Sequence, residues 1–174
     1  MTNQIITSIV LLLLLAIVIA YYDVRYRRIP NLLVIATLIC GLILNIKWAG
    51  WAGAAASLKG GALAFGLMLI LHIFSALGAG DVKLFASIGS IIGVQQVPTA
   101  YVVVIITGGV VALFTAALAG TLRETFHRVS LILVNLLSGW QPPRFPTPAD
   151  KKHTVPYGVA ITMGSLVSLA FFSS

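Results

Sequence analysis

The chain has 174 residues, of which 59% are hydrophobic and 9% are charged, and its mean hydropathy is +1.05. An average soluble domain carries roughly 25% charged residues, so this composition excludes a soluble globular protein and an intrinsically disordered one. The 11 Lys and Arg residues outnumber the 4 Asp and Glu residues, which in a membrane protein indicates basic cytoplasmic loops and not a nucleic-acid partner. We therefore predict a polytopic membrane protein.

Six apolar segments are predicted to cross the bilayer as helices, because a spanning helix needs about 20 mostly apolar residues. In chain order they cover residues 5–22, 32–46, 62–77, 82–94, 100–119 and 155–172. The stretch at 47–61 is interpreted as a connection with interfacial tryptophans. The polar segment at 121–154 is predicted to be a long basic cytoplasmic loop with an amphipathic first half on the membrane surface. We thus expect one all-α, membrane-embedded domain over residues 1–174.

The basic residues predict the orientation of these helices. Arg25, Arg27 and Arg28 follow the first apolar segment and no basic residue precedes it, which is the reverse of a cleavable signal peptide. An uncleaved helix with its N-terminus outside the cytoplasm is therefore expected, and cytoplasmic loops then hold nine of the eleven basic residues. The nine are Arg25, Arg27, Arg28, Lys83, Arg123, Arg128, Arg144, Lys151 and Lys152. Anionic lipid headgroups are their expected partners.

Two of the four acidic residues, Asp23 and Asp81, are predicted to lie at the cytoplasmic ends of different helices. Acidic groups close to hydrocarbon are costly and by default indicate function. Two carboxylates held close together cannot both ionise, so one keeps its proton. The ionised partner can activate water for attack on a peptide carbonyl, and the protonated partner can donate to the carbonyl oxygen. The alternative interpretations are an interfacial salt bridge at Asp23 and a helix cap at Asp81.

The residues around both aspartates resemble the signature motifs of a known family. Asp23 is followed closely by Ile29-Pro30-Asn31, Asp81 stands in Gly78-Ala79-Gly80-Asp81-Val82-Lys83, and the last apolar segment opens with Val155-Pro156-Tyr157-Gly158. These motifs, at the ends of the first and fourth predicted helices and at the start of the last, are similar to those of the type IV prepilin peptidases, the GxGD family of membrane aspartic proteases. The resemblance covers nearly the whole chain.

The resemblance implies a function and a site. It implies an aspartic endopeptidase, without cofactor or metal, that removes the short basic leader from prepilin-like precursors at the cytoplasmic face of a prokaryotic inner (plasma) membrane. The implied catalytic residues are Asp23 and Asp81. The residues implied to bind substrate or shape the site are Gly78, Gly80, Lys83, Pro30, Asn31, Pro156, Tyr157 and Gly158.

Several of these residues also have a physical interpretation. Gly78 and Gly80 remove side chains where the chain breaks, which lets the backbone approach a peptide substrate. Pro30 suits the first turn of a helix. The ammonium of Lys83 either favours an ionised Asp81 or extends to lipid phosphates.

His72 is the remaining polar side chain of interest near this face. It lies roughly two turns from the cytoplasmic end of its segment. We expect it to make an interhelical hydrogen bond, with tuning of the aspartates as the alternative.

The chain is most similar to the short members of the family. The larger members carry an N-terminal insertion with a cysteine tetrad and N-methylate the new terminus, whereas Cys40 is the single cysteine here. Methyltransferase activity is therefore not expected, and the peptidases of tight-adherence (Flp) pili are the most similar subgroup, with the short archaeal preflagellin peptidases as the alternative. A small proton-coupled transporter or channel that uses the two aspartates as a relay is the alternative function. Transporters, however, bind near the midplane and often contain repeats, and no repeat is visible here.

Overall fold

Five helices make up the part of the chain that the computed structural model describes, which is residues 3–26, 29–73, 77–118, 120, 130 and 157–172. They are α1 (Asn3–Tyr26), α2 (Asn31–Ile73), α3 (Ala79–Ile92), α4 (Val97–Leu118) and α6 (Tyr157–Phe172). No strand occurs in these ranges, so the predicted all-α class is confirmed. The predicted polar loop at 121–154 lies, except for residue 130, outside the described residues.

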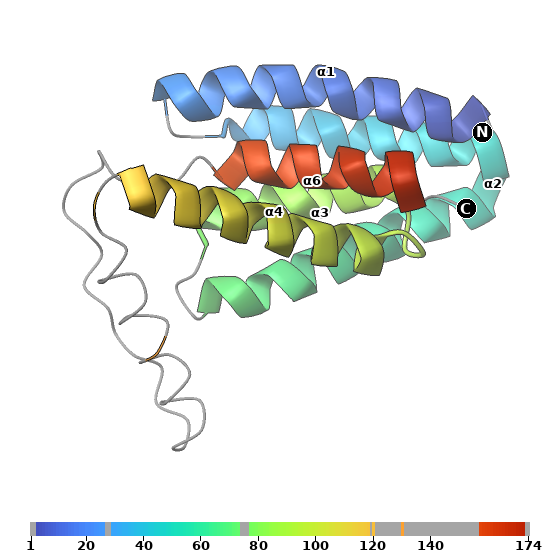
Figure 1. The fold of residues 1–174 in the computed structure, drawn as a ribbon. Helices are drawn as coiled ribbons and strands as arrows, with labels where there is room; N and C mark the ends of the chain where they lie inside the picture. Colours follow the sequence, from blue (N-terminus) through green and yellow to red (C-terminus); the bar gives the residue numbers. More distant parts are fainter. Residues whose placement is uncertain are drawn as a thin grey trace.

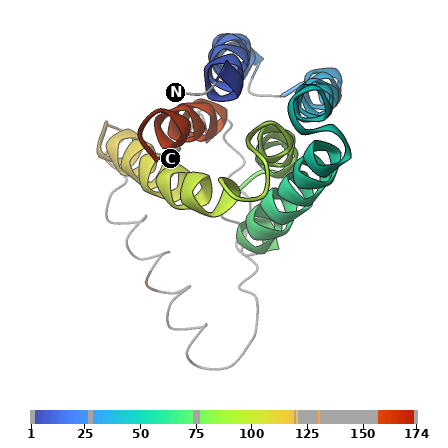
Figure 2. The same cartoon turned by 90° about the vertical axis from the view of Figure 1, so that its right-hand side faces the viewer.

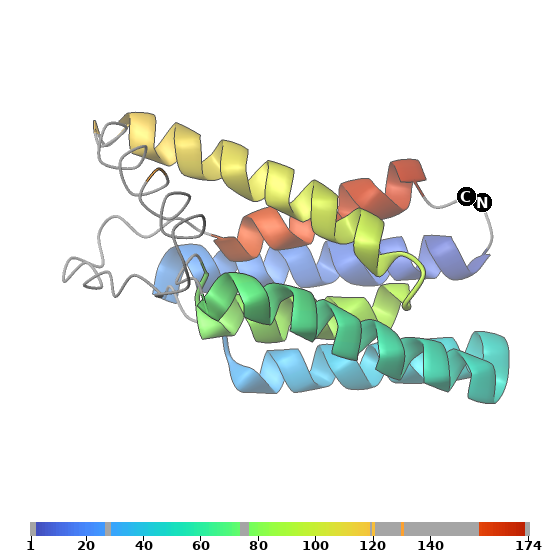
Figure 3. The same cartoon turned by 90° about the horizontal axis from the view of Figure 1, so that it is seen from below.

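α2 reverses its direction near its middle. A straight helix of its 43 residues would be about 65 Å long, roughly twice the hydrocarbon thickness of a bilayer. The helix is broken at Ala49 (φ −135°, ψ 15°) and Gly50 (φ 57°, ψ −136°), and Gly tolerates the positive φ because it has no Cβ. Figures 1 and 3 show the two limbs of α2 joined at one end of the bundle and running in opposite directions.

The second and third predicted segments therefore lie in the two limbs of one helix. The interpretation of 47–61 as a connection is wrong, since this stretch is helical except at the break. Its alanines favour helix, and only two residues need to leave helical geometry for the chain to turn back. The described part of α2 reaches Ile73, and residues 74–76 of the predicted segment lie outside the described residues. Trp51, one residue past the break, is 92% exposed, as expected for an interfacial anchor.

The helices pack as two groups that meet at α3 and α6. α3 packs most extensively against α2, and α6 packs against α1 and α4, with a smaller contact between α3 and α6. Figure 2, viewed along the bundle, shows α3 beside both limbs of α2 and α6 between α1 and α4. The core is apolar where the groups meet, and Leu84, Phe85 and Ile88 of α3 are fully buried. We refer below to the α2–α3 group and the α1–α4–α6 group.

Polar contacts hold α3 against α2 at the end remote from Asp23. The Asn45 amide nitrogen donates to the carbonyl oxygens of Ser90 (2.9 Å) and Ile91 (3.1 Å), and the Ser57 hydroxyl donates to the Ser90 carbonyl (2.8 Å). The backbones approach so closely at Gly60 and Gly89 that a Cβ at either would collide with the other helix. Small residues and interhelical hydrogen bonds are the means by which helices associate in lipid, where hydrophobic contrast is absent.

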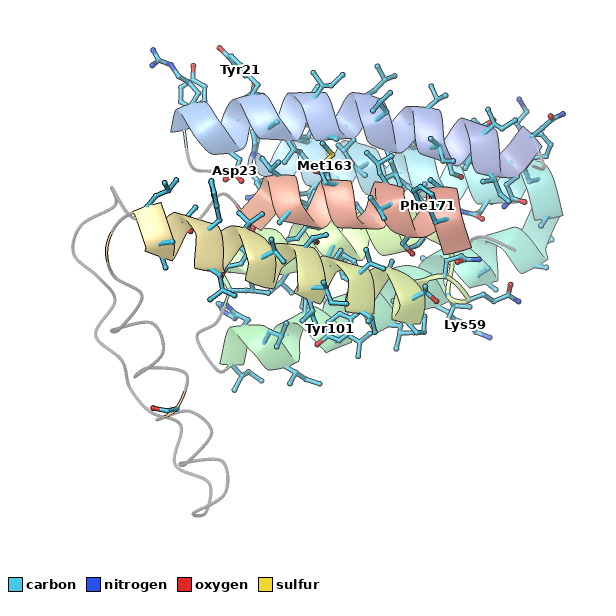
Figure 4. The ribbon with its side chains drawn as sticks, in the orientation of Figure 1. Tyr21, Asp23, Lys59, Tyr101, Met163 and Phe171 are labelled. Carbon is cyan, nitrogen blue, oxygen red and sulfur yellow. The ribbon has the colours of Figure 1, made fainter. Side chains whose placement is uncertain are left out.

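The structure contains helices suited to cross a membrane. Among the described residues, α1, α2 and α4 are long and apolar enough to do so, and α6 is a shorter apolar helix. Large apolar side chains such as Leu14 (59% exposed), Ile106 (60%) and Val110 (61%) point outward, as lipid-facing residues do. Figure 4 shows Tyr21 and Lys59 at opposite ends of the bundle. The protein is a membrane protein.

Candidate active site

Asp23 lies in the last turn of α1, at the N-terminus of α6 (Figure 4). The backbone N–H of Gly158, the second residue of α6, donates to Asp23 Oδ2 at 2.9 Å. The first N–H groups of a helix have no partner within the helix, and they favour a negative charge placed beside them. A Cβ at position 158 would lie 2.9 Å from Asp23 Oδ2 and 3.1 Å from Ile19 Cγ2. The absence of a side chain at Gly158 therefore permits this contact.

Asp81 is the third residue of α3, and the residue that caps this helix is Gly78. The Asp81 backbone N–H donates to the Gly78 carbonyl at 3.1 Å, and the Gly78 N–H donates to Asp81 Oδ2 at 3.2 Å. The second bond is the half of a capping box in which the side chain of the third helical residue accepts from the N–H of the cap residue, and Gly78 has no side chain to supply the other half. The alternative interpretation of Asp81 as the N-cap residue is wrong by three positions, although its carboxylate does help to cap the helix.

Burial has the largest effect on the pKa of Asp81, a residue that precedes the predicted span at 82–94. Burial raises this pKa from 3.8 to about 6, because a charged carboxylate is poorly solvated there. The hydrogen bond from Gly78 opposes this rise, and the negative charge of Asp23 adds to it. The two carboxyls thus lie within electrostatic range of each other, and Asp81 can hold or release a proton near neutral pH.

Comparison with known proteins assigns the family. A model of the type IV leader peptidase family matches residues 10–113, which is more than half of the chain and includes both aspartates. The chain belongs to the type IV leader peptidase family. No curated protein and no solved structure gives a match. The family supports a protease acting on prepilin-like substrates and does not favour the transporter or channel. The Flp subgroup stays a prediction.

The match ends before α6, so the contribution of α6 to this leader peptidase comes from the geometry. Tyr157 is the first residue of α6, and its ring lies 3.7 Å from the position that a Cβ on Gly108 of α4 would take. The backbone N–H of the next residue, Gly158, contacts Asp23. Of the three residues predicted at the start of the last helix, Gly158 therefore lies at an aspartate, Tyr157 precedes it in the first turn of α6, and Pro156 is outside the described residues.

The remaining motif residues of the leader peptidase connect α2 to α3. Lys83 Nζ donates to Asn31 Oδ1 at 3.3 Å, and both side chains are exposed. The Lys83 ammonium therefore contacts a second motif residue. Pro30 immediately precedes α2, and its carbonyl accepts from the N–H groups of Leu33 and Val34. The prediction that Pro30 lies within the first turn is wrong by one residue.

Gly78 and Gly80 leave the backbone accessible beside Asp81. Both residues are exposed, and in the described part of the chain a Cβ on Gly80 would meet no atom within 4 Å. The described residues thus leave this stretch of backbone uncovered, and its contact with a peptide substrate stays a prediction. Among the described residues no three His, Cys, Asp or Glu side chains gather into a group that could hold a metal ion.

His72 has a partner that the sequence did not indicate. Its Nδ1 lies 2.8 Å from the carbonyl oxygen of Leu77, five residues further along the chain. The expectation of a bond between neighbouring helices is therefore wrong, because this contact closes the connection between α2 and α3. The signal that marked the residue was a single histidine in an otherwise apolar segment.

Proposed function

We propose that this leader peptidase is an aspartic endopeptidase whose catalytic pair is Asp23 and Asp81. The observation that carries the proposal is that α1 and α3, from the two helix groups, bring these carboxyls within electrostatic range beside the N-terminus of α6. Acidic side chains are rarely placed together at a membrane face without a function. The substrates are prepilin-like precursors, from which the enzyme removes the short basic leader.

The two environments favour different chemical roles. The Gly158 N–H stabilises charge on Asp23, so Asp23 takes a proton from water as the water oxygen attacks the scissile carbonyl carbon. Burial favours a protonated Asp81, which donates its proton to the carbonyl oxygen. The C–N bond of the tetrahedral intermediate then breaks, and a proton passes to the leaving amine. The catalytic cycle needs one proton shared by the pair.

The cleavage takes place at the cytoplasmic face of a prokaryotic inner membrane. In the arrangement we propose, the six spans lie within α1, the two limbs of α2, α3 from residue 82 onward, α4 and α6, in a single domain. α1 starts and α6 ends at the same end of the bundle (Figure 1), as an even number of crossings requires. Arg25 and Lys83 lie near the aspartates in sequence, at the face that positive residues mark as cytoplasmic. Anionic lipid headgroups bind the basic residues there.

The substrate approaches along the exposed backbone of Gly78 and Gly80. A precursor that becomes extended at its cleavage site can form main-chain hydrogen bonds with this segment. Lys83 and Asn31, which contact each other at 3.3 Å, border the same connection. Leader removal at this position needs neither a cofactor nor a metal.

A substrate-shift assay in membranes tests the proposal. The chain is co-expressed with a prepilin that has Gly before its cleavage site, and loss of the leader is followed by gel mobility. Asp23→Asn and Asp81→Asn should each abolish processing, because either change removes one half of the proton exchange. Asp150→Asn, the same substitution in the predicted polar loop, is the matched control and should process normally. Normal cleavage by either Asp23→Asn or Asp81→Asn would refute the catalytic pair.

A further inference from the structure

A single peptide group links His72 to Asp81. The carbonyl of Leu77 and the N–H of Gly78 belong to the same planar amide, in which they point in opposite directions. His72 Nδ1 lies 2.8 Å from that carbonyl oxygen, and the N–H donates to Asp81 Oδ2 at 3.2 Å. The chain of contacts therefore runs from an imidazole on α2, through one amide, to a carboxyl on α3.

The contact determines which ring nitrogen of His72 carries a proton. A carbonyl oxygen can only accept a hydrogen bond, so Nδ1 of His72 must carry a proton and donate it. An amide that accepts at its oxygen becomes a better donor at its nitrogen, because hydrogen bonds in a chain polarise one another. The bond from His72 thus strengthens the bond that Gly78 makes to Asp81, in addition to orienting it.

Orientation matters here because the Leu77 carbonyl and the Gly78 N–H belong to one rigid peptide and turn together. Gly78 is exposed and has no side chain, and its extended conformation (φ −75°, ψ 152°) lies in a broad allowed region. A peptide on the N-terminal side of a glycine rotates easily when its carbonyl has no partner. His72 is only half-buried, yet it is carried by a regular helix, so its position is set by α2.

We propose that His72 is a positioning residue that orients the Leu77–Gly78 peptide so that its N–H holds the Asp81 carboxyl in its reactive position. The inference rests on the proposed function and assigns to it a residue that acts through a backbone amide. His72 acts on the catalytic step through Asp81. Its loss should therefore lower kcat more than it raises KM, because only the Leu77–Gly78 peptide of the segment along which substrate binds is released, whereas Gly80 stays within α3.

Three substitutions separate this role from ordinary packing. In His72→Asn the side-chain amide nitrogen occupies nearly the position of Nδ1 and can donate to Leu77 O. In His72→Gln the amide nitrogen extends further, and in His72→Leu there is no donor. We expect kcat to fall roughly tenfold in His72→Leu and His72→Gln, as for the loss of one hydrogen bond of about 1.4 kcal/mol, with KM changed by less than about twofold. His72→Asn should retain most of the kcat of the unsubstituted chain.

The matched control is Thr115→Val, because Thr115 is also half-buried and its hydroxyl donates to backbone carbonyls within α4. This variant loses a hydrogen bond between a side chain and the backbone without touching the connection, so its kcat should not change. Equal kcat in His72→Asn and His72→Gln, or an unchanged kcat in His72→Leu, would overturn the proposal. If His72→Leu does not accumulate in membranes, the comparison of kcat between His72→Asn and His72→Gln tests the proposal by itself.

Amide hydrogen exchange gives a second measurement that does not depend on proteolysis. In purified chain, the backbone amides at 78–82 should exchange faster in His72→Leu than in the unsubstituted chain, and His72→Asn should restore their protection. Identical exchange in all three proteins would overturn the positioning role. Failure of the proposed function would look different, since Asp81→Asn would then process precursor normally whatever the exchange at 78–82.

Discussion

Gly158→Ala tests how closely the reaction depends on the backbone of α6. The new Cβ would lie 2.9 Å from Asp23 Oδ2 and 3.1 Å from Ile19 Cγ2, whereas ordinary contact begins at 3.4 Å. The carboxyl or the helix must therefore shift by about 0.5 Å. A hydrogen bond to a charged group contributes about 1.5 to 3 kcal/mol, and we expect its partial loss to cost about 1 to 2 kcal/mol of transition-state stabilisation. Processing should then be roughly 5- to 30-fold slower.

The matched control is Gly108→Ala, since both substitutions add one methyl group to a buried helical glycine. At Gly108 the new Cβ would lie 3.7 Å from the Tyr157 ring, which is ordinary contact. Both variants gain helix propensity of up to about 1 kcal/mol, so both should accumulate in membranes. The measurement is kcat/KM with purified enzyme and a precursor in detergent. Equal kcat/KM in the two variants would refute the role assigned to the Gly158 N–H.

Two further predictions concern the proton and the packing. Because the pKa of Asp81 is raised to about 6 and its protonated form is the proposed acid, kcat/KM should fall as pH rises through about 6. An increase of kcat/KM between pH 6 and about 8 would contradict this assignment. Asn45→Leu removes the donations to the carbonyls of Ser90 and Ile91, so the free energy of unfolding should fall by about 2 kcal/mol and the Tm by roughly 4–8 °C. Thr7→Val, which loses an exposed bond within α1, is its control, and equal Tm values would contradict the role of Asn45.

The sequence predicted where apolar helices occur but not how the chain turns between two of them. Length and hydropathy are local properties, so the segments at 5–22, 82–94 and 100–119 correspond closely to α1, α3 and α4. The turn within α2 depends on which of several neighbouring glycines leaves helical geometry. Only Gly50 does so in this stretch, and Gly53, Gly60 and Gly61 have the same intrinsic freedom. Packing against α3 decides between them, and packing is not a local property.

The site shows the same division between local and long-range information. Charge and membrane depth made Asp23 and Asp81 candidates for a pair, and the resemblance of the motifs around them favoured the pair over a salt bridge and a helix cap. The donor to Asp23, however, is a backbone N–H 135 residues away. A contact made by the backbone cannot be predicted from residue types. The partner of Lys83 is also distant in the sequence, because its long, flexible side chain donates to Asn31. Contacts of this kind follow from the path of the helices, which composition and spacing do not specify.

The division of the bundle into two helix groups has a consequence for regulation of the enzyme. Asp81 is carried by the α2–α3 group and Asp23 by the α1–α4–α6 group, and the groups meet mainly between α3 and α6, with smaller contacts of α2 with α4 and of α1 with α3. A relative displacement of the groups changes the separation of the carboxyls directly, without distorting any helix. The bilayer surrounds both groups, so its lateral pressure and thickness act on that separation. Proteolytic activity should therefore respond to the lipid in which the enzyme is reconstituted.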